Sequence, residues 1–242
     1  MWQNQVSKHH SFYKISTALK KSLFRLQRPI HGTRALWIII AFPVLITASD
    51  WVLQKDSNDI KVYTRDVAGS DYKEIKVDLT IKSTLAGISK VFNDVPGQTS
   101  WSYNCTQAKL LKKISTYNYY TYCVFTAPWP VSDRDIISHV VQTQDTSTKV
   151  ITVKITSDKN YLPEKEGIVR VESSKITATF TPLKGGLVQI VYQIYTDPGG
   201  SVPSSLVNMF VYDAPYNSFL SFKKIVSKPE NCTCKSKDIK EL

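Results

Sequence analysis

The sequence is poor in the residues and motifs from which most catalytic and metal centres are built. Its 242 residues include four histidines, four cysteines, nine glycines and eleven prolines. His9, His10 and His31 precede residue 50, which leaves His139 as the one histidine in the rest of the chain. The sequence has no Gly-x-x-x-x-Gly-Lys phosphate loop, no Gly-x-Gly-x-x-Gly loop and no Gly-x-Ser-x-Gly nucleophile elbow. A histidine-cluster metal site is therefore excluded, and we expect no metal and no cofactor.

Acidic residues are missing from positions 1–49, although the whole chain carries a formal net charge of +11. Seven lysines and arginines in that stretch contribute +7, whereas residues 50–222 hold 18 basic and 17 acidic residues. A nucleic-acid-binding domain would carry its basic residues on the folded part of the chain. The distribution therefore argues against a nucleic-acid partner. The Lys-rich segment 229–242, which we expect to form a polar tail, suits weak attraction to an anionic membrane better.

A mostly apolar run, residues 35–48, follows this basic stretch. As a helix it would span about 21 Å, which is short of the ~30 Å hydrocarbon core of a bilayer. A positive flank, a short apolar run and the small residue Ala48 are typical of a secretory signal peptide. We expect residues 1–34 to be a basic extension or a long charged region before the signal, and the mature chain to be exported to the periplasm or envelope. The alternatives are a buried core helix, against which Pro43 argues, and a cytoplasmic location if 35–48 is not a signal.

From residue 50 onward, alternation of apolar and polar residues predicts mainly strands. Ser83 or Thr84 can cap a short helix whose apolar residues follow three-to-four spacing and which ends near Pro96. The predicted strands cover residues 60–65, 75–82, about 105–115, 118–127, 134–144, 149–157, 167–182 and 187–196.

The end of the domain has a helical pattern instead. Residues 203–226 predict one long helix, with Pro203 near its first turn and a kink or brief break at Pro215. Its expected apolar stripe comprises Val207, Phe210, Val211, Ala214, Ser218, Phe222 and Ile225, with Leu206, Met209 and Phe219 widening it. The fold class is α+β: because the apolar face of a sheet must be buried, we expect a curved antiparallel sheet packed around this helix, in one domain over residues 50–228.

One charged cluster, Asp133-Arg134-Asp135, stands at the start of a predicted strand. The two carboxylates could form an acid/base pair. The alternative is that the planar guanidinium of Arg134 bridges acids or backbone carbonyls where a loop enters the strand. The second interpretation is favoured, and His139 is interpreted as an ordinary sheet residue.

The four cysteines leave their redox state open. Cys105 and Cys123 fall in predicted strands, and Cys232 and Cys234 in the polar tail. An even number permits disulfides in an exported chain, but a domain of this size has enough core to fold without them. The Cys232–Cys234 spacing is too close for a convincing zinc site.

Several segments resemble, in order, the lipid-transfer domains of the steroidogenic-acute-regulatory-related (START) family. They are 51–65, Trp101 with Asn104-Cys105, 109–114, Ala127-Pro-Trp-Pro-Val-Ser-Asp-Arg-Asp135, 161–167 and Thr196-Asp-Pro-Gly-Gly-Ser-Val-Pro203. The resemblance implies a helix-grip fold, in which a sheet of seven to nine strands wraps the C-terminal helix around an apolar tunnel. It also implies a monomer that binds one lipid or sterol-like molecule without catalysis, touches membranes transiently, and uses the C-terminal helix and an adjacent loop as a lid.

In animal sterol carriers of this family an acid and an arginine often lie inside the cavity, and the corresponding positions here are Gln107 and Val140. A charged cavity floor and sterol specificity are therefore in doubt. The expected tunnel and lid residues are Trp101, Tyr120, Tyr122, Trp129, Arg134, Leu206, Phe210, Ala214 and Phe219. Two alternatives stay open. One is a helix-grip enzyme of the aromatase/cyclase type, and the other is a basic membrane-surface protein that retains residues 1–34.

Overall fold

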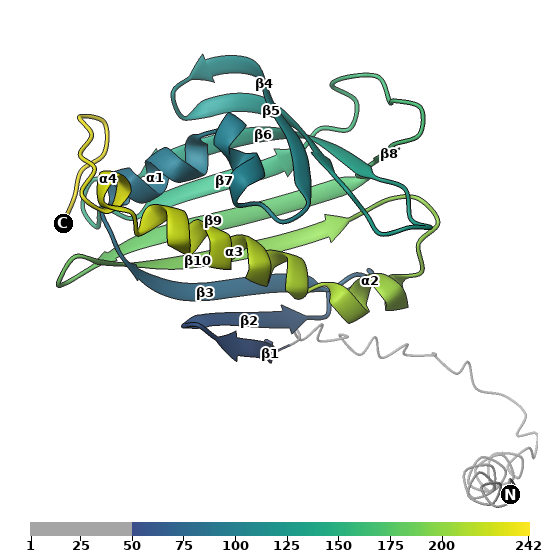
Figure 1. The fold of residues 1–242 in the computed structure, drawn as a ribbon, viewed down its shortest axis with the longest axis horizontal. Coiled ribbons are helices and arrows are strands. Elements are labelled where there is room, and N and C mark those ends of the chain that lie inside the picture. The colour runs from purple at the N-terminus through teal and green to yellow at the C-terminus, as the bar shows by residue number, and fades with distance from the viewer. Residues whose placement is uncertain (1–49) are drawn as a thin grey trace, which may run out of the picture. The chain divides into compact units, whose positions relative to one another are not determined.

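The computed structural model describes residues 50–242, so the predicted extension 1–34 and signal segment 35–48 lie outside the described part. Ten strands in residues 50–242 belong to one sheet (Figure 1). They are β1 (Val52–Ser57), β2 (Ile60–Arg65), β3 (Glu74–Lys82), β4 (Cys105–Ser115), β5 (Asn118–Phe125), β6 (Arg134–Gln144), β7 (Ile151–Ser157), β8 (Val169–Arg170), β9 (Ser173–Leu183) and β10 (Leu187–Asp197). The helices are α1 (Leu85–Asn93), a 3-10 turn η1 (Pro96–Ser100), α2 (Ser204–Phe210), α3 (Asp213–Val226) and α4 (Pro229–Cys232).

The order of strands across the sheet is β1-β2-β3-β10-β9-β7-β6-β5-β4, and every neighbouring pair on this path is antiparallel. The two-residue β8 pairs in parallel with the start of β6. The predicted antiparallel sheet is therefore confirmed. Two differences are that β1 precedes the first predicted strand, and that the predicted strand 167–182 is divided into β8 and β9.

α1 begins where the sequence predicts. The Thr84 hydroxyl accepts a hydrogen bond from the Gly87 amide at 3.0 Å, as an N-cap residue does. The Glu241 carboxylate, from the far end of the chain, accepts bonds from the Leu85 and Ala86 amides at 2.9 Å each. A carboxylate here compensates the positive end of the helix dipole.

The C-terminal helix is two helices rather than one. α2 ends at Phe210 and α3 begins at Asp213, so Pro215 is the third residue of α3. At that position its missing N–H leaves no intrahelical bond unmade, but its ring would clash with the carbonyl of Val211 if one helix continued through both. The predicted break at Pro215 thus occurs one turn earlier. The buried face of α3 consists of Tyr216, Phe219, Phe222 and Val226, and not the full predicted stripe.

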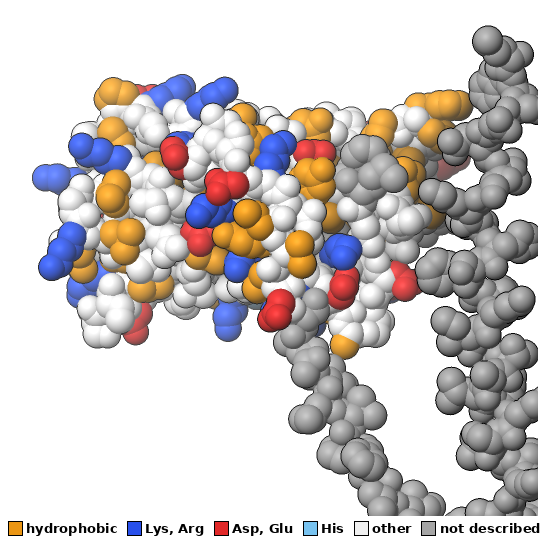
Figure 2. Space-filling view, turned by 90° about the horizontal axis from the view of Figure 1, so that it is seen from below, with side chains coloured by type: hydrophobic (Ala, Val, Ile, Leu, Met, Phe, Trp, Pro, Cys, Tyr) orange, Lys and Arg blue, Asp and Glu red, His pale blue; other side chains and the backbone are white. Residues whose placement is uncertain are grey.

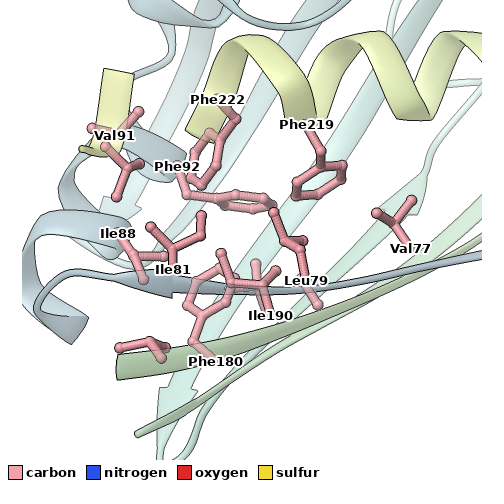
Figure 3. Packing of buried hydrophobic residues seen from close by; sticks show 14 of the residues in the cluster. Val77, Leu79, Ile81, Ile88, Val91, Phe92, Phe180, Ile190, Phe219 and Phe222 are labelled. Carbon is pink, nitrogen blue, oxygen red and sulfur yellow. The ribbon is translucent and has the colours of Figure 1, made fainter. Parts of the chain in front are cut away.

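The core fills the space between the sheet, α1 and one half of α3 (Figure 3). Phe222 is fully buried; its ring centroid lies 5.1 Å from that of Trp101 and 6.1 Å from that of Phe92. Phe92 in turn meets the edge of Phe180 at 5.3 Å. Figure 3 shows the rings of Phe92, Phe180 and Phe222 between α3 and the strands, with Ile88 and Ile190 alongside.

Residues 229–242, expected to be a polar tail, pack against the domain. Ile239 and Asn231 are buried. The side-chain amide of Gln144 donates to the Lys240 carbonyl at 2.7 Å and accepts from the Lys240 amide at 2.9 Å. On the face in Figure 2, acidic side chains lie among the lysines and arginines, and no continuous basic stripe is seen. Within residues 50–242, no helix has the length and apolarity needed to cross a bilayer.

Candidate ligand-binding cavity

A cavity of about 420 Å³ lies between the sheet and the half of α3 that the aromatic core leaves free. Pocket volumes for small ligands run from about 300 to 1,000 Å³, so the space is adequate for one small molecule. The lining residues are Phe92, Val95, Gln98, Trp101, Ser102, Tyr103, Tyr119, Thr121, Cys123, Phe125, Arg134, Ile136, Ser138, Val140, Ile155, Val171, Ser174, Ile176, Tyr192, Ile194, Thr196, Pro198, Ala214, Pro215, Ser218 and Phe219.

The strand alternation decides which side chains reach the cavity. On β5 and β6 every second residue lines it, which gives Tyr119, Thr121, Cys123, Phe125, Arg134, Ile136, Ser138 and Val140. The residues between them lie on the other face of the sheet, since successive side chains of a strand point in opposite directions. The wall is therefore mixed: aliphatic and aromatic side chains surround a pair of hydroxyls, Thr121 and Ser138, which are opposite each other in the register.

Small side chains on the first turns of α3 keep the space open. Ala214 and Ser218 line the cavity, whereas Phe219, the residue after Ser218, fills the gap between helix and sheet and meets the Tyr192 ring at 5.0 Å. Ser218 also accepts a hydrogen bond from the Tyr103 amide at 2.9 Å. This bond ties α3 to the segment after η1 and closes that side of the cavity.

Further contacts attach α2 and α3 to the β-hairpin loops. Asn208 of α2 donates to the Asp71 carbonyl at 2.8 Å and accepts from the Lys73 amide at 3.3 Å. Near the start of α3, the Tyr216 hydroxyl accepts from Asn58 at 2.7 Å. Because these contacts of Asn208 are partly exposed, we expect local opening of α2 to cost less than unfolding of the core.

Arg134 is the one charged residue among the described residues that line the cavity. Its guanidinium donates to the backbone carbonyls of Ser132 and Gly199, the latter at 3.5 Å. These bonds hold the start of β6 next to the β10–α2 connection, and Figure 1 shows that the β5–β6 connection lies at the same end of the sheet. Partial burial lowers the pKa of Arg134, while the negative charge of Asp133 raises it. The favoured interpretation of Arg134, as a bridge to backbone carbonyls, is confirmed.

The flanking acids are engaged elsewhere. Asp135 is fully buried and forms a two-pronged ion pair with Arg170, at 2.6 and 3.1 Å. This pairing raises the pKa of Arg170. Asp133 accepts a hydrogen bond from the Ala127 amide at 3.1 Å and so holds the β5–β6 loop. The two carboxylates therefore do not converge on a common site.

Four of the nine expected tunnel residues line the cavity: Trp101, Arg134, Ala214 and Phe219. Tyr120 and Tyr122, which were expected to line the tunnel, instead lie on the outer face of β5. Tyr120 stacks on His139 and Tyr161 with centroids 4.4 and 4.6 Å apart, and Tyr122 packs in a second cluster with Val124 and Ile137.

The other expected lid residues lie away from the cavity wall or are not described. Trp129 is 93% exposed and Leu206 is 42% exposed, and neither lines the cavity. The side chain of Phe210 lies outside the described part of the structure. Of the two positions matched to charged cavity residues, Val140 lines the cavity and Gln107 does not.

The remaining chemistry-bearing groups offer no second centre. His139 is bonded to Asn118 at 2.8 Å on the outer face, and residues 50–242 contain no cluster of metal-ligating side chains. All four cysteines are free thiols. Cys123, which lines the cavity, lies beside Cys105, and this contact lowers the pKa of the Cys105 thiol. The sequence pattern predicted Ser218 as part of the inward stripe of the C-terminal helix, but it did not indicate the cavity residues Thr121, Ser138 and Tyr192, because polar positions in strands usually face solvent.

Comparison with known proteins accounts for this architecture. The START domain model matches residues 44–226. An uncharacterised protein of Pseudomonas aeruginosa is 36% identical over 181 residues, which cover 75% of this chain and 89% of that protein. Mouse phosphatidylcholine transfer protein is 27% identical over 170 residues, covering 67% of this chain and 77% of that protein.

Solved structures of STAR-related lipid transfer proteins have a similar fold. The crystal structure of a STAR-related lipid transfer protein fragment from Xanthomonas axonopodis is 32% identical, has a TM-score of 0.69, and is matched over 74% of this chain and 99% of that one. Human StAR-related lipid transfer protein 5 shares the fold with 19% identity and a TM-score of 0.63, over 73% of this chain and 86% of that one. The resemblance noted in the sequence is confirmed, and the chain belongs to the START domain family.

Proposed function

We propose that this protein binds one lipid in the cavity beneath α3 and carries it between membranes without chemical change. The observation that carries the proposal is the cavity itself: about 420 Å³ of space inside the fold, lined mainly by apolar side chains and closed by a helix. Burying alkyl groups there is worth roughly 0.8 kcal/mol per CH₂ relative to water, which offsets the cost of removing the lipid chain from a bilayer. The START fold is a lipid-binding and lipid-transfer fold. The Xanthomonas axonopodis and mouse proteins matched above are both named as lipid transfer proteins.

The way the polar groups are used supports transfer without chemistry. An acid/base pair of the kind the aromatase/cyclase alternative needs would have to come from Asp133 and Asp135, and Asp135 is neutralised by Arg170 on the far side of β6 from the cavity. His139 lies on the outer face with Tyr120. No observation in residues 50–242 favours an enzyme, so that alternative is not proposed.

We assign the lid to α2 and the first turn of α3. Opening would break the Asn208 bonds to the β2–β3 loop, and the small residues at the start of α3 would then uncover the cavity. Replacing Asn208 with alanine is expected to speed lipid release, measured by stopped-flow transfer to acceptor vesicles. Unchanged release would place the lid elsewhere.

Membrane contact is assigned to the β5–β6 loop. Trp129 at its tip is 93% exposed, and tryptophan favours the interfacial region of bilayers. We expect Trp129→Ala to reduce vesicle binding and transfer rate without changing the amount of lipid bound. Trp51→Ala is the matched control, because Trp51 is held by the cations of Arg65 and Lys76 on β2 and β3.

The test of lipid binding is native mass spectrometry of the full chain purified without detergent. We expect a bound lipid of discrete mass. Ser138→Phe, which places a ring in the cavity, should abolish it, whereas Thr156→Phe, at an exposed position of β7, should not. An empty wild-type protein that takes up no lipid from vesicles would overturn the proposal.

We also propose export, on the basis of the basic stretch and the apolar run 35–48, with the mature chain beginning near Ser49. N-terminal sequencing of the protein recovered from cells tests this. A product that retains Met1 would contradict it and would favour a cytoplasmic or membrane-surface protein.

A further inference from the structure

The cavity holds a single charge. Among its described lining residues, Arg134 carries a positive charge and none carries a negative one. Apolar pockets use a few placed polar groups to fix a ligand's orientation and chemical class. A lone guanidinium at the wall of such a pocket therefore indicates which headgroup the ligand carries.

No carboxylate within the described residues 50–242 lies within 4 Å of the Arg134 guanidinium. The neighbouring acids already have partners. Asp133 accepts from the Ala127 amide, Asp197 accepts from the Gly199 amide at 3.0 Å, and Asp135 is paired with Arg170. Two backbone carbonyls occupy part of the guanidinium, which has five N–H donors in all. Donors thus remain for a ligand, and no carboxylate of the described residues forms an ion pair with the guanidinium.

Partial burial makes this charge costly, and it lowers the Arg134 pKa. An anionic headgroup would offset that cost, because carboxylates and phosphates accept paired hydrogen bonds from the planar guanidinium. A neutral headgroup would leave the guanidinium without an ion-pair partner. The wall of the cavity therefore favours an anion over an alcohol or an ester at this place.

The geometry also separates head from tail. Arg134 is the first residue of β6, and Val140, which also lines the cavity, is six residues further along, or about 20 Å at the rise of a strand. At the Val140 end, Tyr119 lies opposite in the register and its hydroxyl reaches Asn93 of α1. The chain of a lipid bound at Arg134 would thus run from the β10–α2 connection toward α1.

The volume limits the number of chains. At about 420 Å³ the cavity lies near the lower end of the range of about 300–1,000 Å³ for small-ligand pockets, which favours a ligand with one alkyl chain over a ligand with two.

On the basis of the function proposed above, we propose that the ligand is a single-chain lipid with an anionic headgroup, a carboxylate or a phosphate, which Arg134 binds at the end of the cavity nearest the β10–α2 connection. The claim concerns the class of ligand and is separable from lipid binding itself.

The experiment measures affinities of the delipidated full chain by displacement of Nile red. The probes are myristic acid, myristoyl lysophosphatidic acid, tetradecanol, a two-chain phosphatidic acid, inorganic phosphate and acetate. We expect the two single-chain anions to bind about 10- to 100-fold more tightly than tetradecanol, the effect of one charge-assisted hydrogen-bonding group. Phosphate and acetate should not displace the dye, because the alkyl chain supplies most of the affinity.

Variants tie the selectivity to one side chain. Arg134→Gln should remove the preference for anions, so that myristic acid and tetradecanol bind with similar affinity, while Arg134→Lys should retain part of the preference. Lys154→Gln is the control, since it removes one positive charge from an exposed position on β7. The wild-type comparison needs no variant, so the claim stays testable if Arg134→Gln fails to fold.

The outcomes distinguish the two proposals. Tetradecanol binding as tightly as myristic acid, or undiminished selectivity in Arg134→Gln, would overturn the anionic headgroup while leaving lipid binding intact. Tighter binding of the two-chain phosphatidic acid would overturn the single chain. Displacement by inorganic phosphate alone would show a free-anion site. Failure of every lipid, tetradecanol included, would instead refute the proposed function.

Discussion

Replacing Asp135 with asparagine is expected to destabilise the fold strongly and to leave ligand binding by the folded protein intact. The side chains of Arg170 and Asp135 are only 3% and 1% exposed and share two hydrogen bonds. The guanidinium of Arg170 also donates hydrogen bonds to the carbonyls of Lys159, Leu162 and Pro163. The pair therefore fastens the segment before β8 to the start of β6.

The magnitude follows from the burial. Removing one partner of a buried ion pair leaves an uncompensated charge and costs about 3–5 kcal/mol. Since natural domains are stable by about 5–15 kcal/mol, this is a large share of the total. For a domain of this size each kcal/mol shifts Tm by about 2–4 °C, so Tm should fall by roughly 6–20 °C.

Asp133→Asn is the matched control. Asp133 is only half-buried, and an asparagine carbonyl can keep the bond from the Ala127 amide, so its cost should stay below about 1 kcal/mol. Calorimetry gives both Tm values, and dye displacement well below Tm gives ligand affinity. Equal Tm values for the two variants would refute the structural role of the pair. Loss of binding in a stable Asp135→Asn protein would point to a functional acid instead.

Three further substitutions test the packing around the cavity. Phe222→Ala should cost about 3–5 kcal/mol in urea unfolding, because the ring is fully buried; a cost below 1 kcal/mol would mean that the aromatic core is loose. Glu241→Ala should cost about 1 kcal/mol by removing the cap of α1, and an unchanged midpoint would show that the C-terminal segment does not dock in solution. Gly199→Ala should cost more than 1 kcal/mol, since φ is +67° and the added Cβ would lie 2.8 Å from the Arg170 carbonyl oxygen. A thermal melt that coincides with that of the wild type would contradict this backbone conformation at Gly199.

Much of the fold follows from local patterns. Period-two alternation located most of the strands, and Pro215 marked the break in the C-terminal helix, because a proline acts on the carbonyl four residues earlier. Packing between segments far apart in the sequence could not be predicted. Nothing in the sequence near Glu241 indicates that its carboxylate bonds to the start of α1, 156 positions away.

The site was harder to predict for a specific reason. Alternation shows that Tyr120 and Tyr122 share a face of β5 but not which face. The usual guide, that the apolar face is the inner one, fails because Tyr161, Leu162 and Ile168 cover part of the outer face as well. Conversely, Ser138 has a polar side chain and yet lines the cavity, as a ligand-binding wall allows and a packed core does not.

The most direct test of the central claim is photo-crosslinking with a single-chain lipid that carries a diazirine at the end of its alkyl chain, offered as the acid and as the alcohol. The full chain is irradiated with the probe, digested, and its labelled peptides are identified by mass spectrometry. A lipid held beneath α3 should label β5, β6, β7 or β10 at cavity-facing positions such as Val140, Ile155 and Tyr192. Labels confined to the outer-face cluster around Tyr161, or no label from either probe, would contradict a lipid-binding cavity.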